Sequence, residues 1–425
     1  MRLFPALTIY RMLLPLLFIA AFPGWLVKML RRGGFGTRLG ERAAIYTTPL
    51  EYEPCGAVHF HAVSVGEAML ALKLIREWLV REPGRRFVLA TGTATGHAVA
   101  TAANIPGLRV TYAPLDFPSM VHRYLARFEP AQIVLIEGEV WPHLLRACRQ
   151  NAIPVRLVNA RMSPRSARRY QKLAGWLRPL FGMLDAAAIQ DPGDGPIWQN
   201  LGVAPERIHA TGSLKFDPGS GARPARRPEF QQILTRLGNP HPVILAASTH
   251  AGEESWIAAA IRGAAPQALP VIAPRHAERR AEVKAELEGA GFETVLRSAF
   301  APPENPARAC LVIDSTGELR DWTAHADVVV IGKSFLSTGG QNPCEAILAG
   351  KPVIVGPHME NFQPLVSQLI AAGGCLVAGD SATLSQAIIA ALDPPQAEAL
   401  TRNATAVLTR HDGATQRIIG ILKRP

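Results

Sequence analysis

The sequence predicts an α/β protein with two domains, each built around a parallel sheet. Beyond about residue 56, short apolar runs alternate with helical stretches, and each run is followed by Gly, Ser, Thr or Asp. Strands that are buried on both faces of a parallel sheet have this appearance. A segment rich in Pro, Gly and Arg (residues 217–228) interrupts the alternation, which then starts again. A chain of 425 residues is also too long for one ordinary core.

The expected strands fall into two successive series. The first is 57–63, 86–91, 108–112, 132–136, 155–159 and 186–190, and the second is 243–247, 271–274, 310–313, 328–331 and 353–355. Two βαβ series predict two Rossmann-like domains that face a cleft, with ligands outside the carboxyl ends of the strands. We therefore expect a membrane anchor at 1–32, an N-terminal domain at 33–211, a linker at 212–240 and a C-terminal domain at 241–425.

The N-terminal segment from Leu13 to Val27 is almost wholly apolar, and counting from Leu3 gives a longer stretch interrupted by Arg11. A membrane-spanning helix needs about 20 apolar residues, so the length is borderline. The heavier basic cluster follows the apolar stretch, which under the positive-inside rule keeps the remaining chain in the cytoplasm. This cluster is Lys28, Arg31, Arg32, Arg38 and Arg42. We favour a signal anchor, and the alternatives are an interfacial helix and a cleaved signal peptide.

The formal net charge of +11 favours anionic partners, which are nucleic acid, anionic lipid or phosphorylated substrates. Aromatic residues make up only 7%, and no basic stretch is interleaved with stacking aromatic side chains, so nucleic acid is the weaker choice. The five cysteines are scattered without a Cys-x-x-Cys pair. This argues against a zinc site or a disulfide framework and suits a reducing compartment.

Candidate functional residues in the first half follow the ends of expected strands. Ser64 and Glu67 have capping-box spacing, so Glu67 is either a helix cap or a general base at the mouth of a cleft. Residues 91–96 (TGTATG) are either an anion-binding helix start or a tight turn. Glu137 and Glu139 flank a glycine at another strand end, where carboxylates are costly unless solvated or functional. A basic run nearby is either a solvated face or a contact for lipid phosphates; it includes Arg161, Arg165 and Arg168.

In the second half, the Gly-rich turn that starts a helix at residues 339–345 is the strongest signal. Such a turn attracts phosphate, and Glu345 one turn further can accept hydrogen bonds from ribose hydroxyls. The two glycines alone are also compatible with a simple turn. Other polar residues near strand ends are His250, His276 and His358, which are dispersed and lack metal-ligand spacing.

Nine short segments carry a family resemblance: Ser64–Glu67, Glu139–Pro142, Asn159–Ser166, Gly212–Asp217, Ser248–Glu254, Pro274–Glu278, Gly317–Leu319, Gly339–Glu345 and Gly356–Phe362. In this order they resemble the transferases that add 3-deoxy-D-manno-octulosonic acid (Kdo) to a lipid A precursor. The resemblance implies a GT-B fold, with acceptor in the N-terminal and donor in the C-terminal domain. It also implies CMP-Kdo as donor, inversion at the anomeric carbon, no metal and no other cofactor.

The resemblance further implies roles for individual residues. Glu67 matches the family's general base, and Glu139 and Lys215 match groups credited with transition-state stabilisation. The segments that contact the nucleotide match Pro274, Arg275, Gly317, Glu318, Leu319, Asn342, Pro343, Cys344 and Glu345. In this scheme Glu67 takes the proton of the acceptor hydroxyl, while Arg275 and the helix start hold the departing CMP phosphate.

The chain departs from the family pattern at five positions, one of which, Val140, stands where the family usually has Leu. Gly138 and His143 stand where the family usually has Thr and Asn, in the half expected to hold the acceptor. Ala277 and Arg279 stand where it usually has Pro and Phe.

We expect a CMP-Kdo-dependent transferase on the cytoplasmic face of an inner membrane, where it meets a lipid A precursor and the anionic inner leaflet. One alternative is a GT-B glycosyltransferase with another donor or acceptor. Another is a non-catalytic paralogue that binds nucleotide and lipid. The presence of Glu67, Lys215 and Arg275 favours the enzyme.

Overall fold

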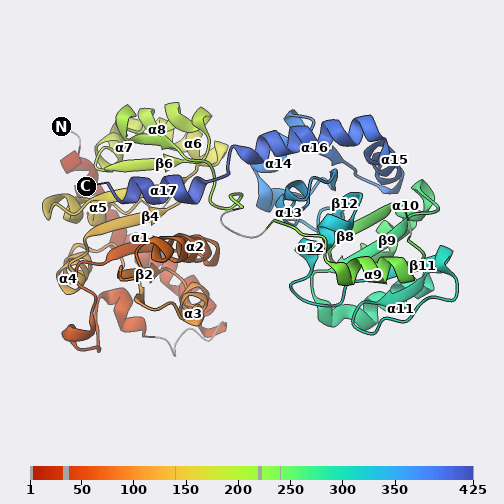
Figure 1. Ribbon diagram of the computed structural model, residues 1–425. Coiled ribbons are helices and arrows are strands. Elements are labelled where there is room, and N and C mark those ends of the chain that lie inside the picture. The colour runs from red at the N-terminus through yellow and green to blue at the C-terminus, as the bar shows by residue number, and fades with distance from the viewer. Residues whose placement is uncertain (1–2, 32–37, 139, 219–222, 240, 425) are drawn as a thin grey trace. The chain divides into compact units, whose positions relative to one another are not determined.

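The computed structural model describes residues 3–31, 38–138, 140–218, 223–239 and 241–424. The chain divides into two compact units (Figure 1): unit 1 comprises residues 1–219 and 413–425, and unit 2 comprises residues 220–412. Each unit contains one parallel sheet of seven strands, so the predicted α/β fold is confirmed.

The sheet of unit 1 has the strand order β3-β2-β1-β4-β5-β6-β7. Its strands are β1 (Val58–Ala62), β2 (Phe87–Thr91), β3 (Leu108–Tyr112), β4 (Gln132–Ile136), β5 (Val155–Ala160), β6 (Ala186–Ile189) and β7 (Ile208–Ala210). The first six lie where the sequence predicts them, and β7 is an additional short edge strand. The chain order reverses between β1 and β4, which makes their carboxyl ends the position where ligands bind in such sheets.

Helices cover both faces of this sheet: α2 (Val65–Arg81), α3 (Ala94–Ala102), α4 (Pro118–Phe128), α5 (Pro142–Gln150), α6 (Pro164–Lys172), α7 (Ala174–Phe181), α8 (Gly195–Asn200) and α17 (Ala414–Leu422). Buried residues of α2, α3 and α17 form one apolar cluster with the sheet. Those of α4, α5, α7 and α8 form a second cluster. The strands are therefore buried on both faces, as their continuous apolar sequences predict.

The last helix, α17, belongs to unit 1, although the sequence analysis placed residues 413–425 in the C-terminal domain (Figure 1). Ile418 and Ile419 are fully buried in the cluster with α2. The carboxylate of Asp217 accepts hydrogen bonds from the backbone N–H groups of Gly413 (3.1 Å) and Thr415 (2.6 Å). The buried apolar face of α17 and the capping carboxylate of Asp217 therefore both attach this helix to unit 1.

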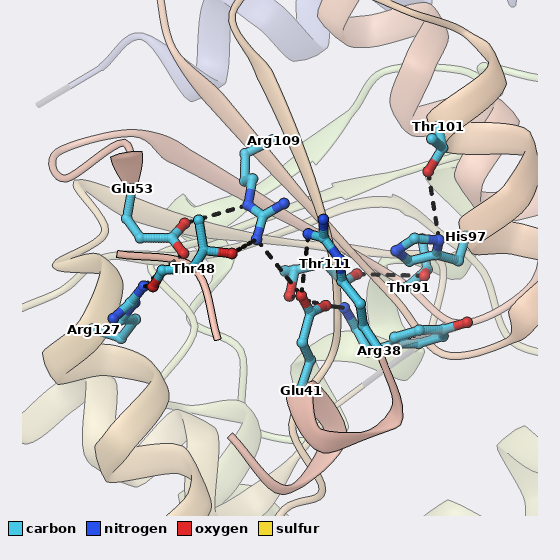
Figure 2. Close-up of polar contacts among 11 residues, drawn as sticks. Arg38, Glu41, Thr48, Glu53, Thr91, His97, Thr101, Arg109, Thr111 and Arg127 are labelled. Atoms are coloured by element: carbon cyan, nitrogen blue, oxygen red, sulfur yellow. Dashed lines mark hydrogen bonds and ion pairs between the residues drawn. The ribbon is translucent and has the colours of Figure 1, made fainter. Parts of the chain in front are cut away.

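A buried ion network joins the segment after the N-terminal helix to the edge strand β3 (Figure 2). Glu41, in the 3-10 helix η2 (Leu39–Ala43), accepts hydrogen bonds from Thr111 Oγ1 (2.8 Å) and Tyr112 N (3.0 Å). Arg109 lies between Glu41 (3.6 Å) and Glu53 (3.3 Å). Because edge strands expose unpaired polar groups, the contacts of Glu41 with Thr111 and Tyr112 also protect the edge of the sheet at β3.

The N-terminal helix α1 (Leu3–Arg31) contains an 18-residue apolar window, Leu7–Gly24. Among the described residues it is the one helix long and apolar enough to cross a membrane. Its large side chains are mostly exposed, including Met12 (71%) and Ile19 (66%).

The sheet of unit 2 has the order β10-β11-β9-β8-β12-β13-β14. Its strands are β8 (Val243–Thr249), β9 (Leu269–Pro274), β10 (Glu293–Leu296), β11 (Ala309–Val312), β12 (Val328–Ile331), β13 (Val353–Val355) and β14 (Leu376–Val377). The five strands predicted for this half are present, while β10 and β14 are additional. The chain order reverses between β8 and β12.

The helices of unit 2 are α9 (Pro228–Arg236), α10 (Glu254–Ala264), α11 (Arg280–Gly289), α12 (Leu319–His325), α13 (Cys344–Leu348), α14 (Leu365–Ala371), α15 (Ser381–Leu392) and α16 (Pro394–Thr409). The expected linker, 212–240, is largely structured where it is described. Phe230 of α9 stacks on Trp322 of α12 with ring centroids 4.3 Å apart. Residues 212–218 belong to unit 1 instead.

Candidate active site

Where they are described, the nine family-like segments lie at the carboxyl end of a strand or in the connection that follows it. In unit 1 they follow β1, β4, β5 and β7, and in unit 2 they follow β8, β9, β11, β12 and β13. Parallel sheets collect such connections along one edge, so each unit gathers its candidate residues there. These edges are described separately for the two units.

Glu67 lies in the first turn of α2, directly after β1. Its carboxylate accepts hydrogen bonds from the Val63 backbone N–H and the Ser64 hydroxyl, both at 2.8 Å. The Glu67 N–H donates in turn to Ser64 Oγ at 3.2 Å, so Ser64 is the N-cap. The predicted N-cap is therefore present, whereas the Glu67 carboxylate accepts the Val63 N–H and not the Ser64 N–H that a complete capping box uses. These bonds also fix the carboxylate at the carboxyl end of β1, beside the point where the strand order reverses.

Glu137 and Arg161 form an ion pair (3.1 Å) between the connections that leave β4 and β5. Glu137 has a left-handed backbone (φ 62°), which is costly for a residue other than glycine. Arg161, one of the candidate phosphate ligands, thus already has an acidic neighbour. Glu139, a candidate catalytic residue, lies outside the described residues.

The other two phosphate candidates, Arg165 and Arg168, are exposed on α6. Ser163 caps this helix by accepting the Ser166 N–H (3.1 Å), and no acidic residue occurs in α6. The helix therefore presents a basic surface close to the carboxyl end of β5.

Lys215 is exposed between residues that are buried on both sides of it. Lys73 of α2 donates to the carbonyls of Leu214 (2.9 Å) and Asp217 (2.6 Å). Asn159 Oδ1, at the end of β5, accepts the Leu214 N–H at 2.8 Å. These bonds hold the segment after β7 so that the Lys215 side chain projects from a fixed backbone.

In unit 2 the connection after β12 is packed tightly against the end of β8. A Cβ atom on Gly332 would lie 2.6 Å from the Ser248 carbonyl oxygen, so only glycine fits there. The buried carboxylate of Glu253 accepts hydrogen bonds from the N–H groups of Lys333 (2.7 Å) and His250 (3.1 Å). The two connections are therefore locked together at the point where this strand order reverses.

Sequence reasoning missed Lys333. This lysine has a left-handed backbone (φ 54°), and non-glycine residues in that conformation concentrate at functional sites. Burial lowers the pKa of neighbouring His250, and the positive charge of Lys333 adds to this effect. His250 in turn lies 6.1 Å from His276, between ring centroids. The sequence signal was a lysine after Gly332, the glycine that directly follows a buried apolar strand.

Two of the predicted donor segments lie at the ends of β9 and β11. Pro274 ends β9, and the N–H of the exposed Arg275 donates to the Thr249 carbonyl of β8 at 3.0 Å. After β11, Glu318 pairs with Arg297 (3.2 Å) and accepts a hydrogen bond from the Ser315 hydroxyl. Gly317 and Leu319 flank it at the start of α12, and Gly317 is exposed.

The third donor segment, Asn342, Pro343, Cys344 and Glu345, starts α13. Asn342 Oδ1 accepts the Cys344 N–H at 3.0 Å, which turns the chain into the helix. Gly340 before it (φ 69°) has no room for a Cβ atom against Met359. Burial raises the pKa of Glu345, and the nearby Arg320 partly opposes this. No cluster of three or more His, Cys, Asp or Glu side chains suitable for a metal ion occurs in the described part of the chain.

The chain is similar in sequence to known proteins. Residues 37–218 match the family model described as 3-deoxy-D-manno-octulosonic-acid transferase (kdotransferase). The 3-deoxy-D-manno-octulosonic acid transferase of Bordetella pertussis is 36% identical, covering 94% of this chain and 95% of the relative. That of Haemophilus influenzae is 32% identical, covering 91% of each.

Solved structures show the same fold at low sequence identity. The Anabaena protein HepE in complex with UDP has a TM-score of 0.53 at 15% identity, covering 86% of this chain and 99% of that chain. A glycosyltransferase from Rickettsia africae has a TM-score of 0.51 at 10% identity, covering 87% and 99%. The fold is thus of the GT-B type. With about a third of its residues identical to those of two curated relatives over nearly its whole length, the chain belongs to the 3-deoxy-D-manno-octulosonic acid transferase family and is a glycosyltransferase.

Proposed function

We propose that the protein transfers Kdo from CMP-Kdo to a lipid A precursor, lipid IVA, with inversion at the anomeric carbon. The reaction belongs to lipopolysaccharide core biosynthesis and takes place on the cytoplasmic face of the inner membrane. The observation that supports this most directly is the position of the nine segments, which, where they are described, lie at the carboxyl end of a strand or in the connection that follows it. The names of the full-length relatives supply the sugar.

Glu67 is proposed as the general base. Each carboxylate oxygen accepts one hydrogen bond, from Val63 N–H or from the Ser64 hydroxyl. A carboxylate oxygen can accept two hydrogen bonds, so each keeps a lone pair for the proton of the acceptor hydroxyl. Capping and proton abstraction are therefore compatible, and the cap supplies the fixed position that a general base needs.

Lys215 and Glu139 are proposed to stabilise the transition state, in which charge develops on the sugar and on the departing phosphate. The anchoring of the Lys215 backbone by Lys73 and Asn159 supports this role, because a preorganised charge needs little rearrangement during the reaction. Arg161, Arg165 and Arg168 are proposed to meet the phosphates of the lipid acceptor.

In unit 2, Pro274, Arg275, residues 317–319 and residues 342–345 are proposed to bind CMP. Glu345 would accept hydrogen bonds from ribose hydroxyls, and the positive charge of Arg275 would hold the phosphate. We add Lys333 to this set, because its strained backbone is fixed by Glu253 at the end of β12. Its ammonium group suits the donor's anionic groups.

The test is a reconstituted reaction. Purified full-length protein is incubated with CMP-Kdo and tetra-acylated lipid A precursor, and the product is weighed by mass spectrometry. We expect the acceptor mass to rise by one or more Kdo units, with the anomeric configuration opposite to the donor's by nuclear magnetic resonance. Unmodified acceptor together with turnover on another acceptor would overturn the acceptor assignment.

Membrane attachment has a separate test, since α1 carries it. We expect the full-length protein to sediment with membranes in low and in high salt, because apolar contact is not screened by ions. Release by high salt alone would show that basic surface residues, and not α1, hold the protein on the membrane.

A further inference from the structure

Helix α1 packs along unit 1 through one side and leaves its other side uncovered. Leu7 is buried (3% exposed), the ring of Tyr10 lies 5.2 Å from that of His143, and the ring of Phe18 lies 5.9 Å from that of Phe117. Tyr10 follows Leu7 by three residues, and Phe18 follows Tyr10 by eight residues, which is about two helical turns. These spacings place the three side chains on one face of the helix. The opposite side exposes the large apolar residues Ile9, Met12, Leu16 and Ile19, and Leu13 and Leu17 on the flank are exposed as well.

A cavity of about 400 Å³ opens between α1 and the helices α4 and α5. Its lining includes two arginines and two histidines and contains no carboxylate: Arg11, Arg146, His122 and His143. Its volume lies within the range of small-molecule sites, which is roughly 300–1,000 Å³. The charge and size of the cavity therefore suit a small anionic group.

His143 gives the cavity an unsatisfied buried polar atom. The residue is only 6% exposed, yet its Nε2 has no hydrogen-bond partner among the described residues. Burial lowers the pKa of His143, and the positive charges of Arg11 and Arg146 lower it further, which favours the neutral imidazole. A buried polar atom without a partner is uncommon and indicates a missing ligand or water.

Arg11 interrupts the apolar window of α1. Its guanidinium makes no hydrogen bond or ion pair within the described part of the chain, and the same is true of Arg146. An arginine in a membrane-seeking segment is costly unless it meets a partner, and such residues mark binding sites. Asp116, which binds the backbone of His143, does not line the cavity. Its carboxylate is held by the N–H groups of His143 and Leu144, both at 2.9 Å.

We propose that this cavity binds the phosphate of an anionic membrane glycerophospholipid. The guanidinium groups of Arg11 and Arg146 contact the phosphate oxygens, and His143 Nε2–H donates to the same head group. Guanidinium groups suit phosphate because they donate several hydrogen bonds in a fixed fork. The exposed apolar side of α1 contacts the acyl chains, which is why a lipid fits better than a soluble phosphate. The site rests on the proposed attachment of α1 to the membrane.

The experiment measures lipid binding to the full-length protein in detergent by native mass spectrometry. Phosphatidylglycerol is titrated first, and diacylglycerol, which has the same chains without phosphate, is titrated in parallel. We expect one phosphatidylglycerol to bind at least 10-fold more tightly than diacylglycerol. Equal binding of the two lipids would overturn the proposal, because it would show that the acyl chains alone are recognised.

Two variants and one matched control locate the site. Arg146→Gln and His143→Phe, which keeps a ring against Tyr10, should each weaken phosphatidylglycerol binding about 10-fold. Arg149→Gln removes the same charge from the exposed side of α5 and should change binding less than 2-fold. Equal losses in Arg146→Gln and Arg149→Gln would refute the cavity and leave only diffuse surface attraction.

Free phosphate is the other source of the same chemistry. Inorganic phosphate at 10-fold excess over the lipid should leave phosphatidylglycerol bound, since it lacks the contact with α1. Displacement of the lipid would assign the cavity to soluble phosphate and overturn the lipid proposal. If the protein fails to sediment with membranes while the lipid still binds in detergent, the attachment proposal fails and the head-group site stands.

Discussion

Replacing Glu67 by Gln separates the two roles that this residue has been assigned. Glutamine keeps the size of the side chain, and its amide oxygen can still accept the Val63 N–H that lies 2.8 Å from the carboxylate. Its amide NH₂ would face Ser64 Oγ, which can accept a hydrogen bond. Glutamine also serves at this position of a capping box, so we expect the stability to fall by about 1 kcal/mol or less.

The catalytic loss should be larger than the structural loss. An amide cannot take the proton of the acceptor hydroxyl, and loss of a general base lowers turnover on the order of 100-fold or more. That factor corresponds to about 2.7 kcal/mol in activation free energy. Because Glu67 lies in unit 1 and the proposed CMP contacts lie in unit 2, CMP affinity should stay within 2-fold of the wild-type value.

Ser64→Ala is the matched control, because it removes the cap and leaves the carboxylate. The helix loses the bond from Glu67 N–H to Ser64 Oγ, which costs about 1 kcal/mol. Turnover should fall less than 10-fold, since the Val63 N–H still orients the base. The assay is a single-turnover reaction with the enzyme in excess over the lipid acceptor and CMP-Kdo in excess over both. Thermal unfolding of each variant measures its stability in parallel. A Glu67→Gln enzyme with near-normal turnover would end the general-base proposal and leave only the cap.

Three further variants test other parts of the structure. Glu345→Ala should weaken CMP binding by about 1–3 kcal/mol in calorimetry, and unchanged affinity would remove this residue from the donor site. Glu53→Ala leaves Arg127 without its acidic partner and Arg109 with only the longer contact to Glu41. It should lower unfolding stability in urea by about 3 kcal/mol, whereas the exposed Glu398→Ala should change it by less than about 0.5 kcal/mol. Burial raises the pKa of Asp116 from 3.8 to about 6, so its stabilising contribution is complete below pH 3.8 and is lost as the pH rises through 6. Relative to Asp116→Asn, the wild type should therefore lose about 1.3 kcal/mol of stability between pH 5 and 7, and parallel pH profiles would contradict the shift.

The two-domain α/β fold could be predicted because each buried strand is a continuous apolar run closed by a turn residue. The missed strands β7, β10 and β14 have two to four residues and lie at or near sheet edges, where burial is incomplete and the pattern is weak. The return of α17 to unit 1 could not be predicted, because an apolar helix face does not specify which sheet it covers. That choice depends on partners far away in sequence, such as Asp217, which caps its first turn.

The candidate site shows the same division between local and distant information. Local spacing predicts the Ser64–Glu67 cap, and the structure contains it. By contrast, the position of Lys333 depends on Glu253, a residue 80 positions earlier that binds its N–H. No local pattern reports such a contact. The ion pair of Glu137 with Arg161 likewise joins two connections that are adjacent only because β4 and β5 are neighbours.

The packing of α1 bears on how the protein meets the membrane, which the sequence left open between a spanning anchor and an interfacial helix. Contacts from Leu7 to Phe18 tie the first part of α1 to unit 1, so this part cannot enter the bilayer core without separating from the unit. The remaining residues, 19–31, extend about 20 Å at 1.5 Å per residue, whereas the hydrocarbon core is about 30 Å thick. We infer that α1 lies in the membrane interface, with Met12, Leu16 and Ile19 facing the acyl chains. A label on Met12→Cys should then be quenched by shallow but not by mid-bilayer quenchers, and quenching of Ile19→Cys from the bilayer centre would favour a spanning helix.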